Sequence, residues 1–125
     1  MRQLRRIAAS FPFAFAGLAY MVRTQTNFWV HLTTAVIVLA LALSLGVGGL
    51  ELAVLMLVIG LVLVAEAINT ALEATVDLAS PELHPLARVA KDVGAAAVLL
   101  AAGTSVAIGG IILLPRLLRA VGLST

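Results

Sequence analysis

Long stretches without a charged side chain constrain the fold of this sequence more than any other feature. No Asp, Glu, Lys or Arg occurs in residues 24–50, and only Glu51 separates that stretch from the apolar residues 52–65. Residues 93–115 are again free of charge. A helix needs about 20 apolar residues to cross the hydrocarbon core of a bilayer. The sequence therefore predicts an all-α membrane protein with three transmembrane helices.

The composition agrees with this fold class. Hydrophobic residues make up 62% of the 125 residues and charged residues only 11%, whereas soluble domains have about 25% charged residues. We expect one integral-membrane domain over residues 1–125, because the three crossings leave no room for a second, soluble domain. Cys is absent, so only oxygen or imidazole ligands could hold a metal. The net charge of +2 is too small and too scattered for nucleic-acid binding.

The first 23 residues predict a helix that lies in the plane of the membrane interface. Its apolar side chains recur at helical spacing: Leu4, Ile7, Phe11, Phe15, Leu18 and Val22. Three arginines precede most of them: Arg2, Arg5 and Arg6. A cleaved signal peptide is the alternative, because Ala14-Phe15-Ala16 imitates a cleavage site. Pro12 interrupts the short apolar run and favours the interfacial helix.

Turn residues divide the rest of the chain into three predicted crossings, at 28–45, 51–77 and 86–114. Glycines at residues 46–49 end the first crossing, and the loop LASPELHP at residues 78–85 joins the second to the third. Six of the eight basic residues lie on the side of the N-terminus and this loop. The positive-inside rule therefore predicts a cytoplasmic N-terminus. Trp29 is expected to be an interfacial anchor.

A line of polar side chains marks the end of the second crossing, in the segment EAINTALEATVD. At about 100° per residue, Glu66, Asn69, Glu73 and Asp77 point within roughly 80° of one another; we call these four residues the polar stripe. Glu66 lies roughly 22 Å along the helix from Glu51, close to the cytoplasmic edge of the hydrocarbon. A carboxylate in the membrane costs at least about 2.5–3.5 kcal/mol, so the stripe predicts a functional site.

Oxygen ligands at this depth suit Mg²⁺ bound to a polyphosphate, because Mg²⁺ takes one or two carboxylates together with substrate phosphates. Lys91 and Asp92 lie just across the loop, and phosphoryl transfer needs a metal, a cation and a positioned base. No GxxxxGK[ST] motif occurs, which excludes a P-loop mechanism. A static network of ion pairs with Arg23, Arg88 or Lys91 is the structural alternative.

The third crossing contains runs of Gly and Ala, which allow helices to pack closely in lipid. Three crossings alone would not shield the polar stripe from lipid. We therefore expect a homo-oligomer with sites between protomers.

The segments EAINTALEATVD and HPLARVAKDVGAAAVLL, with the spacing between them, resemble the small bacterial membrane lipid kinases, the prokaryotic diacylglycerol kinase and undecaprenol kinase family. The resemblance extends from about Phe13 to Leu114 and is strongest in the motifs E-x-x-N-[ST]-A-x-E-x-x-x-D and A-K-D. It implies phosphorylation of a membrane lipid alcohol that depends on ATP and Mg²⁺. It also implies a homotrimer in the bacterial cytoplasmic (inner) membrane, with sites shared between subunits.

The resemblance also implies roles for individual residues. Glu66 corresponds to the catalytic base that accepts the proton of the lipid hydroxyl, Asn69 orients the catalytic site, and Asp77 lies at its edge. The implied nucleotide-binding residues are Arg6, Phe13, Gln25, Glu73, Lys91 and Asp92, and the implied metal ligands are Glu73 and Gln25. Gln25 stands where many members have Glu, and Phe13 where some have Tyr.

The lipid substrate is predicted from two short segments. His31 after N-F-W-V, and E-L-H-P-L-A at residues 82–87, look more like the undecaprenol kinase branch, so we expect undecaprenol, with diacylglycerol as the alternative. His31 and His84 themselves are expected to be polar interfacial or helix-end residues rather than metal ligands.

Two other classes of protein remain open from the residues alone. A small ion- or proton-coupled transporter subunit would also carry carboxylates in the membrane, but residues 52–65 offer no polar group for a path across the bilayer. A membrane assembly protein without catalytic activity is the other class, if Gln25 marks a lineage that has lost metal binding.

Overall fold

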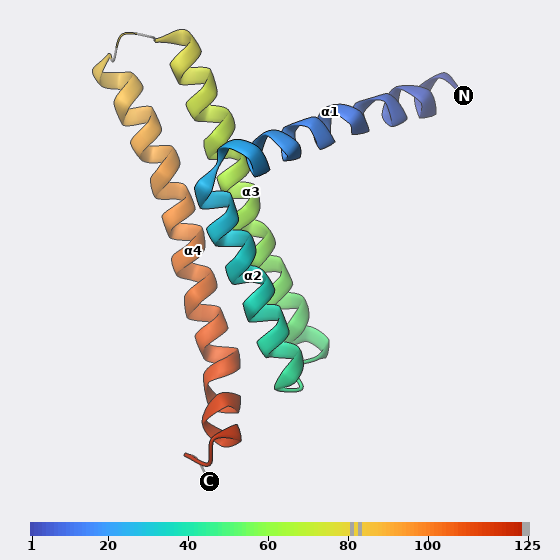
Figure 1. Cartoon of the computed structure of the whole chain (residues 1–125), viewed down its shortest axis with the longest axis vertical. Coiled ribbons are helices and arrows are strands. Elements are labelled where there is room, and N and C mark those ends of the chain that lie inside the picture. Colours follow the sequence, from blue (N-terminus) through green and yellow to red (C-terminus); the bar gives the residue numbers. More distant parts are fainter. Residues whose placement is uncertain (81, 83, 124–125) are drawn as a thin grey trace.

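The computed structural model describes residues 1–80, 82 and 84–123, without the side chains of Arg2 and of residues 4–8. Four helices follow one another along the chain: α1 (Arg2–Thr24), α2 (Thr26–Ser44), α3 (Gly49–Ala79) and α4 (Pro85–Ala120). They are drawn in Figure 1. The described residues include no strand, and the predicted all-α fold class is confirmed.

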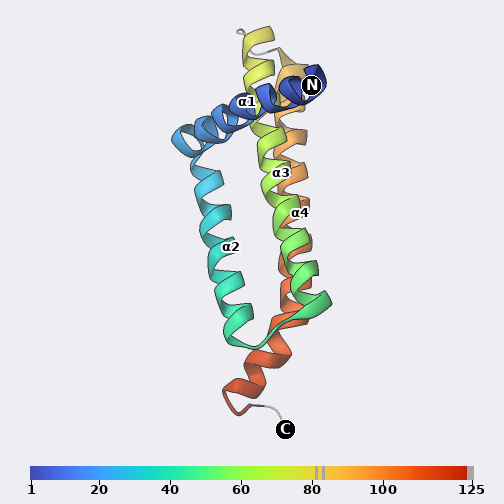
Figure 2. The ribbon, with the colours of Figure 1, turned by 90° about the vertical axis from the view of Figure 1, so that its right-hand side faces the viewer.

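Three of the helices, α2, α3 and α4, are long and apolar enough to cross a membrane. They run together along the long axis of the molecule, whereas α1 extends sideways from one end of α2 (Figures 1 and 2). A separate first helix outside the bundle agrees with the predicted interfacial helix. Pro12 lies inside α1 without ending it, and α4 continues through Pro115 beyond the predicted end at Leu114.

The junction between α1 and α2 is one extended residue, Gln25, with φ −105° and ψ 104°. Its backbone N–H donates to the Met21 carbonyl at 2.9 Å. The indole Nε1 of Trp29 donates to the Val22 carbonyl at 2.8 Å, and so satisfies a carbonyl in the last turn of α1 that the helix itself leaves free. Trp29, predicted as a membrane anchor, thus also joins α2 to α1.

The connection between α2 and α3 packs against the main hydrophobic core; we call this end of the bundle the turn end. Gly46 and Gly49 have φ of 70° and 57°, in the left-handed region that favours glycine. The chain therefore reverses direction within a few residues, as predicted. The buried cluster at this end consists of Ala42, Val47, Leu55, Ile112 and Leu113, contributed by α2, α3, α4 and the turn.

An ion pair joins α3 to α4 at the turn end. Arg116 donates from Nη2 to Glu51 Oε2 at 2.5 Å and from Nη1 to Glu51 Oε1 at 3.3 Å. Its Nη1 also donates to the Ile112 carbonyl at 3.0 Å. Glu51 stands in the first turn of α3, where the helix dipole favours a carboxylate. Both charges of this partly buried pair are therefore balanced.

The other end of the bundle carries the connection between α3 and α4, and we call it the loop end. His84 is the N-cap of α4, and its Nδ1 accepts a hydrogen bond from the Leu86 backbone N–H at 3.2 Å. Pro85 fills the first helical position, where a missing N–H costs little. The expected helix-end role of His84 is therefore confirmed. Of the predicted loop, Pro81 and Leu83 lie outside the described residues.

Candidate functional site

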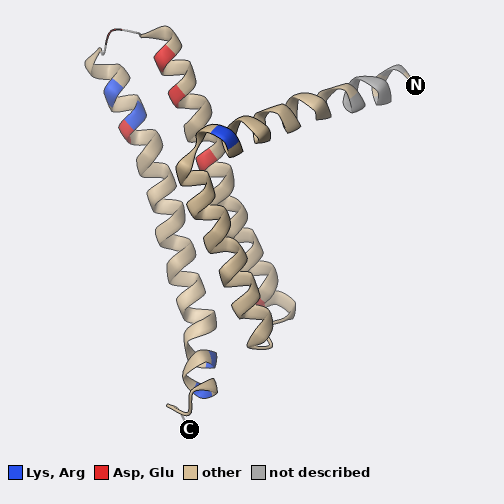
Figure 3. Ribbon diagram, in the orientation of Figure 1, with Lys and Arg blue, Asp and Glu red and all other residues tan. Residues whose placement is uncertain are grey.

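The polar stripe of α3 lies at the loop end, and exposure increases along it. Glu66 is 2% exposed and Asn69 8% exposed, Glu73 is half-buried, and Asp77 is exposed. Figure 3 shows acidic positions of α3 approaching the loop opposite charged positions near the start of α4. The stripe therefore runs from the interior of the bundle to its surface, as the helical spacing predicts.

Asn69 and Glu73 are joined by a hydrogen bond between side chains one helical turn apart. Asn69 Nδ2 donates to Glu73 Oε1 at 3.2 Å. Glu73 Oε2 has no hydrogen-bond partner among the side chains and backbone that the structure describes. A half-buried carboxylate with one oxygen held and the other free is suited to ligate a cation.

Glu66 is the most deeply buried member of the stripe, and it has no hydrogen bond or ion pair with any described residue. The neighbouring Thr70 hydroxyl is also buried without a partner in the described part of the chain. Burying a polar group without a hydrogen bond costs free energy. Glu66 is therefore poorly explained as a packing residue.

Asp77 and Lys91 form an ion pair between α3 and α4. Lys91 Nζ lies 2.9 and 3.1 Å from the two carboxylate oxygens of Asp77. Static ion pairing, the structural alternative, thus accounts for Asp77. It does not account for Glu66, and Glu73 is attracted by the charge of Lys91 without forming an ion pair with a described cation.

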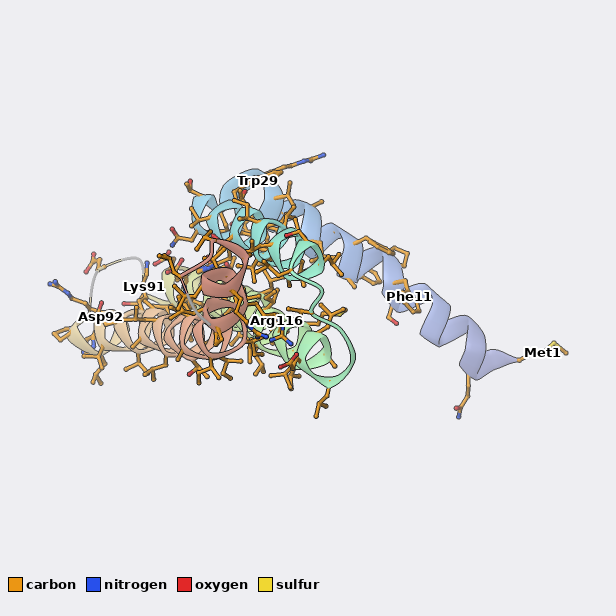
Figure 4. The ribbon with its side chains drawn as sticks, turned by 90° about the horizontal axis from the view of Figure 1, so that it is seen from below. Met1, Phe11, Trp29, Lys91, Asp92 and Arg116 are labelled. Atoms are coloured by element: carbon orange, nitrogen blue, oxygen red, sulfur yellow. The ribbon has the colours of Figure 1, made fainter. Side chains whose placement is uncertain are left out.

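Asp92 follows Lys91 on α4, and its side chain points about 100° away around the helix. It is exposed, and no hydrogen bond or ion pair joins it to the rest of the described chain. Figure 4 shows Lys91 and Asp92 at one side of the bundle and α1 extending away from it, with Phe11 far from both.

Phe13 of α1 and Gln25 at the junction of α1 and α2 have no described hydrogen bond with the polar stripe within one chain. The Phe13 side chain is 78% exposed. Gln25 donates from Nε2 to the neighbouring Thr24 hydroxyl at 3.4 Å and has no described hydrogen bond with the stripe. The side chain of Arg6 lies outside the described residues. Within a single chain the described contacts therefore join Lys91 to the polar stripe, and none joins Phe13 or Gln25 to it.

Two residues at the site were not predicted to belong to it. Thr70, which is not a member of the stripe, is buried beside it. Gly94, which we assigned only to a run of small residues, lies so close to Asn69 and Leu72 that an added Cβ atom would overlap them. Its position three residues after Lys91 places it on the same side of α4 as that lysine, which is the signal that could have identified it.

The described part of the chain contains no group of three or more His, Cys, Asp or Glu side chains that could hold a metal ion. Mg²⁺ needs only one or two protein carboxylates when phosphates and water complete its coordination. The free oxygen of Glu73 therefore fits an ion that binds together with a nucleotide.

Between the three long helices lies a groove of about 260 Å³. Apolar side chains dominate its lining, and His31, Thr34 and Ser105 are its polar members. His31 thus belongs to a helix-packing surface, and no described His, Cys, Asp or Glu cluster includes it. The apolar lining suits hydrocarbon and does not suit a nucleotide.

Known proteins resemble this chain over most of its length. The sequence profile of prokaryotic diacylglycerol kinase matches residues 12–113. A diacylglycerol kinase of Synechocystis sp. is 46% identical over 113 residues, which cover 90% of this chain and 65% of that protein. The chain thus spans just under two thirds of that relative.

Two further relatives are covered more fully. An undecaprenol kinase of Bacillus subtilis is 39% identical over 115 residues, which cover 92% of this chain and 94% of that protein. A diacylglycerol kinase of Pseudomonas aeruginosa is 35% identical over 98 residues, which cover 78% of this chain and 80% of that protein.

Proposed function

This chain belongs to the prokaryotic diacylglycerol kinase family and is a lipid kinase, and from this premise we propose that its substrate is a membrane-dissolved alcohol, undecaprenol. ATP is the co-substrate that a kinase of this family uses, and its γ-phosphoryl group is transferred to the lipid hydroxyl. The observation that carries the proposed phosphoryl transfer is the buried Glu66, without a partner among the described residues. It lies two helical turns from the half-buried Glu73.

Glu66 is the proposed general base. Its carboxylate accepts the proton of the lipid hydroxyl as the hydroxyl oxygen bonds to the γ-phosphorus, while the bond between that phosphorus and the β,γ-bridging oxygen breaks and ADP leaves. No described donor competes for the Glu66 carboxylate. We propose that the hydroxyl group of the lipid reaches Glu66 from the membrane.

Glu73 is the proposed ligand of Mg²⁺, which when bound would offset the negative charge of the ATP phosphates. The Asn69 amide holds Glu73 Oε1 and leaves Oε2 free. Gln25 is proposed as a second, neutral ligand through its carbonyl oxygen. Asn69 thus orients the Glu73 carboxylate and does not itself react.

Lys91 is the proposed cation for the nucleotide phosphates, and Asp77 holds its ammonium group in place through the ion pair of 2.9 Å. The exposed Asp92 is proposed to contact the nucleotide from the same turn of α4. Arg6 and Phe13 are proposed to bind the phosphates and to stack on the base.

A homotrimer is proposed to complete the site. In Figures 1 and 4, α1 leads away from the loop end of its own bundle, so its residues would reach the polar stripe of a neighbouring subunit more easily than their own. We propose that this assembly lies in the bacterial cytoplasmic membrane with a cytoplasmic N-terminus, because the basic residues concentrate on that side.

The transporter alternative is disfavoured by the α3 helix. Between Glu51 and Glu66 its buried side chains are Leu55, Val58 and Val62. Ion or proton transport needs polar groups or water along the path. Between Glu51 and Glu66, α3 offers neither a carboxylate nor an amide.

The substrate proposal is tested by offering purified protein in nanodiscs both undecaprenol and diacylglycerol with Mg-ATP. We expect the larger kcat/KM for undecaprenol, in keeping with His31 and the segment at residues 82–87. A larger value for diacylglycerol would replace the proposed substrate with the alternative. Phosphorylation of neither lipid would contradict the kinase reaction itself.

A further inference from the structure

Gly94 marks the place where the backbone of α4 comes closest to the polar stripe. A Cβ atom added to Gly94 would overlap Asn69 Oδ1 and would lie 2.8 Å from Leu72 Cδ2. By contrast, a Cβ atom added to Gly103, on the same helix, has no described atom within 4 Å. The close approach is therefore a property of Gly94 and not of small residues throughout α4.

The contact constrains the orientation of the Asn69 amide. Asn69 is 8% exposed, and its Oδ1, on the side of Gly94, has no hydrogen-bond partner in the described chain. Its Nδ2 donates to Glu73 Oε1 at 3.2 Å. Because the α4 backbone occupies the space beside Oδ1, a Cβ atom there would force the amide to turn. That movement would take Nδ2 away from Glu73.

We propose that Gly94 is a positioning residue of the phosphoryl-transfer site. Its bare backbone lets α4 hold the Asn69 amide in place, and the amide in turn fixes the Glu73 carboxylate with Oε2 free for a cation. The identity of that cation, Mg²⁺ with a nucleotide, rests on the proposed function. The steric coupling between Gly94 and Asn69 does not.

The experiment compares Gly94→Ala with the matched control Gly103→Ala in the full-length protein. Alanine is normally favoured over glycine in a helix, so Gly103→Ala should keep or raise Tm, whereas Gly94→Ala should lower it. Losing a group that orients a metal ligand typically costs about 10–100-fold. We expect Gly94→Ala to raise the Mg²⁺ concentration for half-maximal turnover by about tenfold, with Gly103→Ala unchanged.

A double variant tests the coupling without any measurement of activity. Asn69→Ala removes Oδ1, and Leu72 Cδ2 is the tip of a flexible side chain that can move. Gly94→Ala should therefore lower Tm much less in the Asn69→Ala background than in the wild type. An equal loss of Tm in both backgrounds would overturn the steric coupling. If Gly94→Ala alone folds poorly, the Tm of the double variant can still be compared with that of Asn69→Ala.

The failures of the two proposals have different signatures. Wild-type protein that phosphorylates neither lipid contradicts the proposed function. An active wild type whose Gly94→Ala variant has the same Tm and Mg²⁺ dependence overturns the positioning role. A lower Tm with unchanged Mg²⁺ dependence also overturns it, because Gly94 would then serve packing alone.

Discussion

The turn end and the loop end of the bundle treat their polar groups in opposite ways. At the turn end, Glu51 and Arg116 neutralise each other beside a buried apolar cluster. At the loop end, Glu66 is buried without a partner in the described chain, and so are Asn69 Oδ1 and Thr70 Oγ1. The charged groups at both ends belong to the same pair of helices, α3 and α4, and α2 adds Ala42 to the apolar cluster at the turn end.

The contrast indicates that the turn end stabilises the bundle and that the loop end carries the reactive groups. Unmet polar groups reduce stability by about 1–3 kcal/mol each when fully buried. They can persist at the loop end because the apolar packing and the ion pair at the turn end hold the helices together. Removing an unmet polar group at the loop end should therefore alter activity with little loss of stability, and truncating an apolar side chain at the turn end should do the reverse.

The largest expected effect is the loss of phosphoryl transfer in Glu66→Gln. The amide keeps the size of the side chain but cannot accept the proton of the lipid hydroxyl, so kcat should fall by about 10²–10⁴-fold. Removing an uncompensated buried carboxylate should leave Tm unchanged or higher. Transfer of labelled phosphate from ATP measures the activity, and retention of most of it would refute the assignment of Glu66 as the base.

Glu73→Ala should affect Mg²⁺ rather than the lipid. Since loss of a residue that merely orients a metal ligand costs about 10–100-fold, loss of the ligand should weaken Mg-nucleotide binding by at least that factor. Calorimetric titration of Mg-ATP and the Mg²⁺ dependence of turnover both report the change. Thr75→Ala, an exposed position on the same helix, is the control, and equal Mg²⁺ dependence in the two variants would remove Glu73 from the metal site.

At the turn end, Leu55→Ala should lower stability without changing the Mg²⁺ dependence. Leu55 is 1% exposed and belongs to the buried cluster, so its truncation leaves a cavity that costs about 2 kcal/mol or more. Leu57→Ala, at a side chain 63% exposed, is the control and should change Tm far less. A shift in Mg²⁺ dependence with Leu55→Ala would show that the two ends are not independent.

Helical periodicity and charge were sufficient to predict the four helices and the alignment of the polar stripe, because both depend on residues near one another in sequence. The continuation of α4 through Pro115 was not predicted. It accompanies the pairing of Arg116 with Glu51, a partner 65 residues away in sequence. Similarly, the contact of Gly94 with Asn69 depends on how closely two helices approach.

Three predicted roles depend neither on nearby residues in the sequence nor on a contact described within one chain. They are those of Arg6, Phe13 and Gln25. Arg6 and Phe13 belong to α1, which extends away from its own bundle (Figure 1), and Gln25 lies at the junction of α1 and α2. These three roles remain predictions, as do the homotrimer and the extent of the single domain.

The smallest expected effect is at the ion pair of the turn end. Arg116→Leu leaves Glu51 without its partner, and because Arg116 is 26% and Glu51 46% exposed at the side chain, water can offset part of the loss. We expect stability to fall by only about 1 kcal/mol. Replacing both members, as Glu51→Leu with Arg116→Leu, should restore much of that loss, since no unpaired charge then remains. If the double variant is less stable than Arg116→Leu alone, the ion pair contributes more to stability than charge balance. The stability of the turn end would then depend on polar contacts as well as on its apolar cluster.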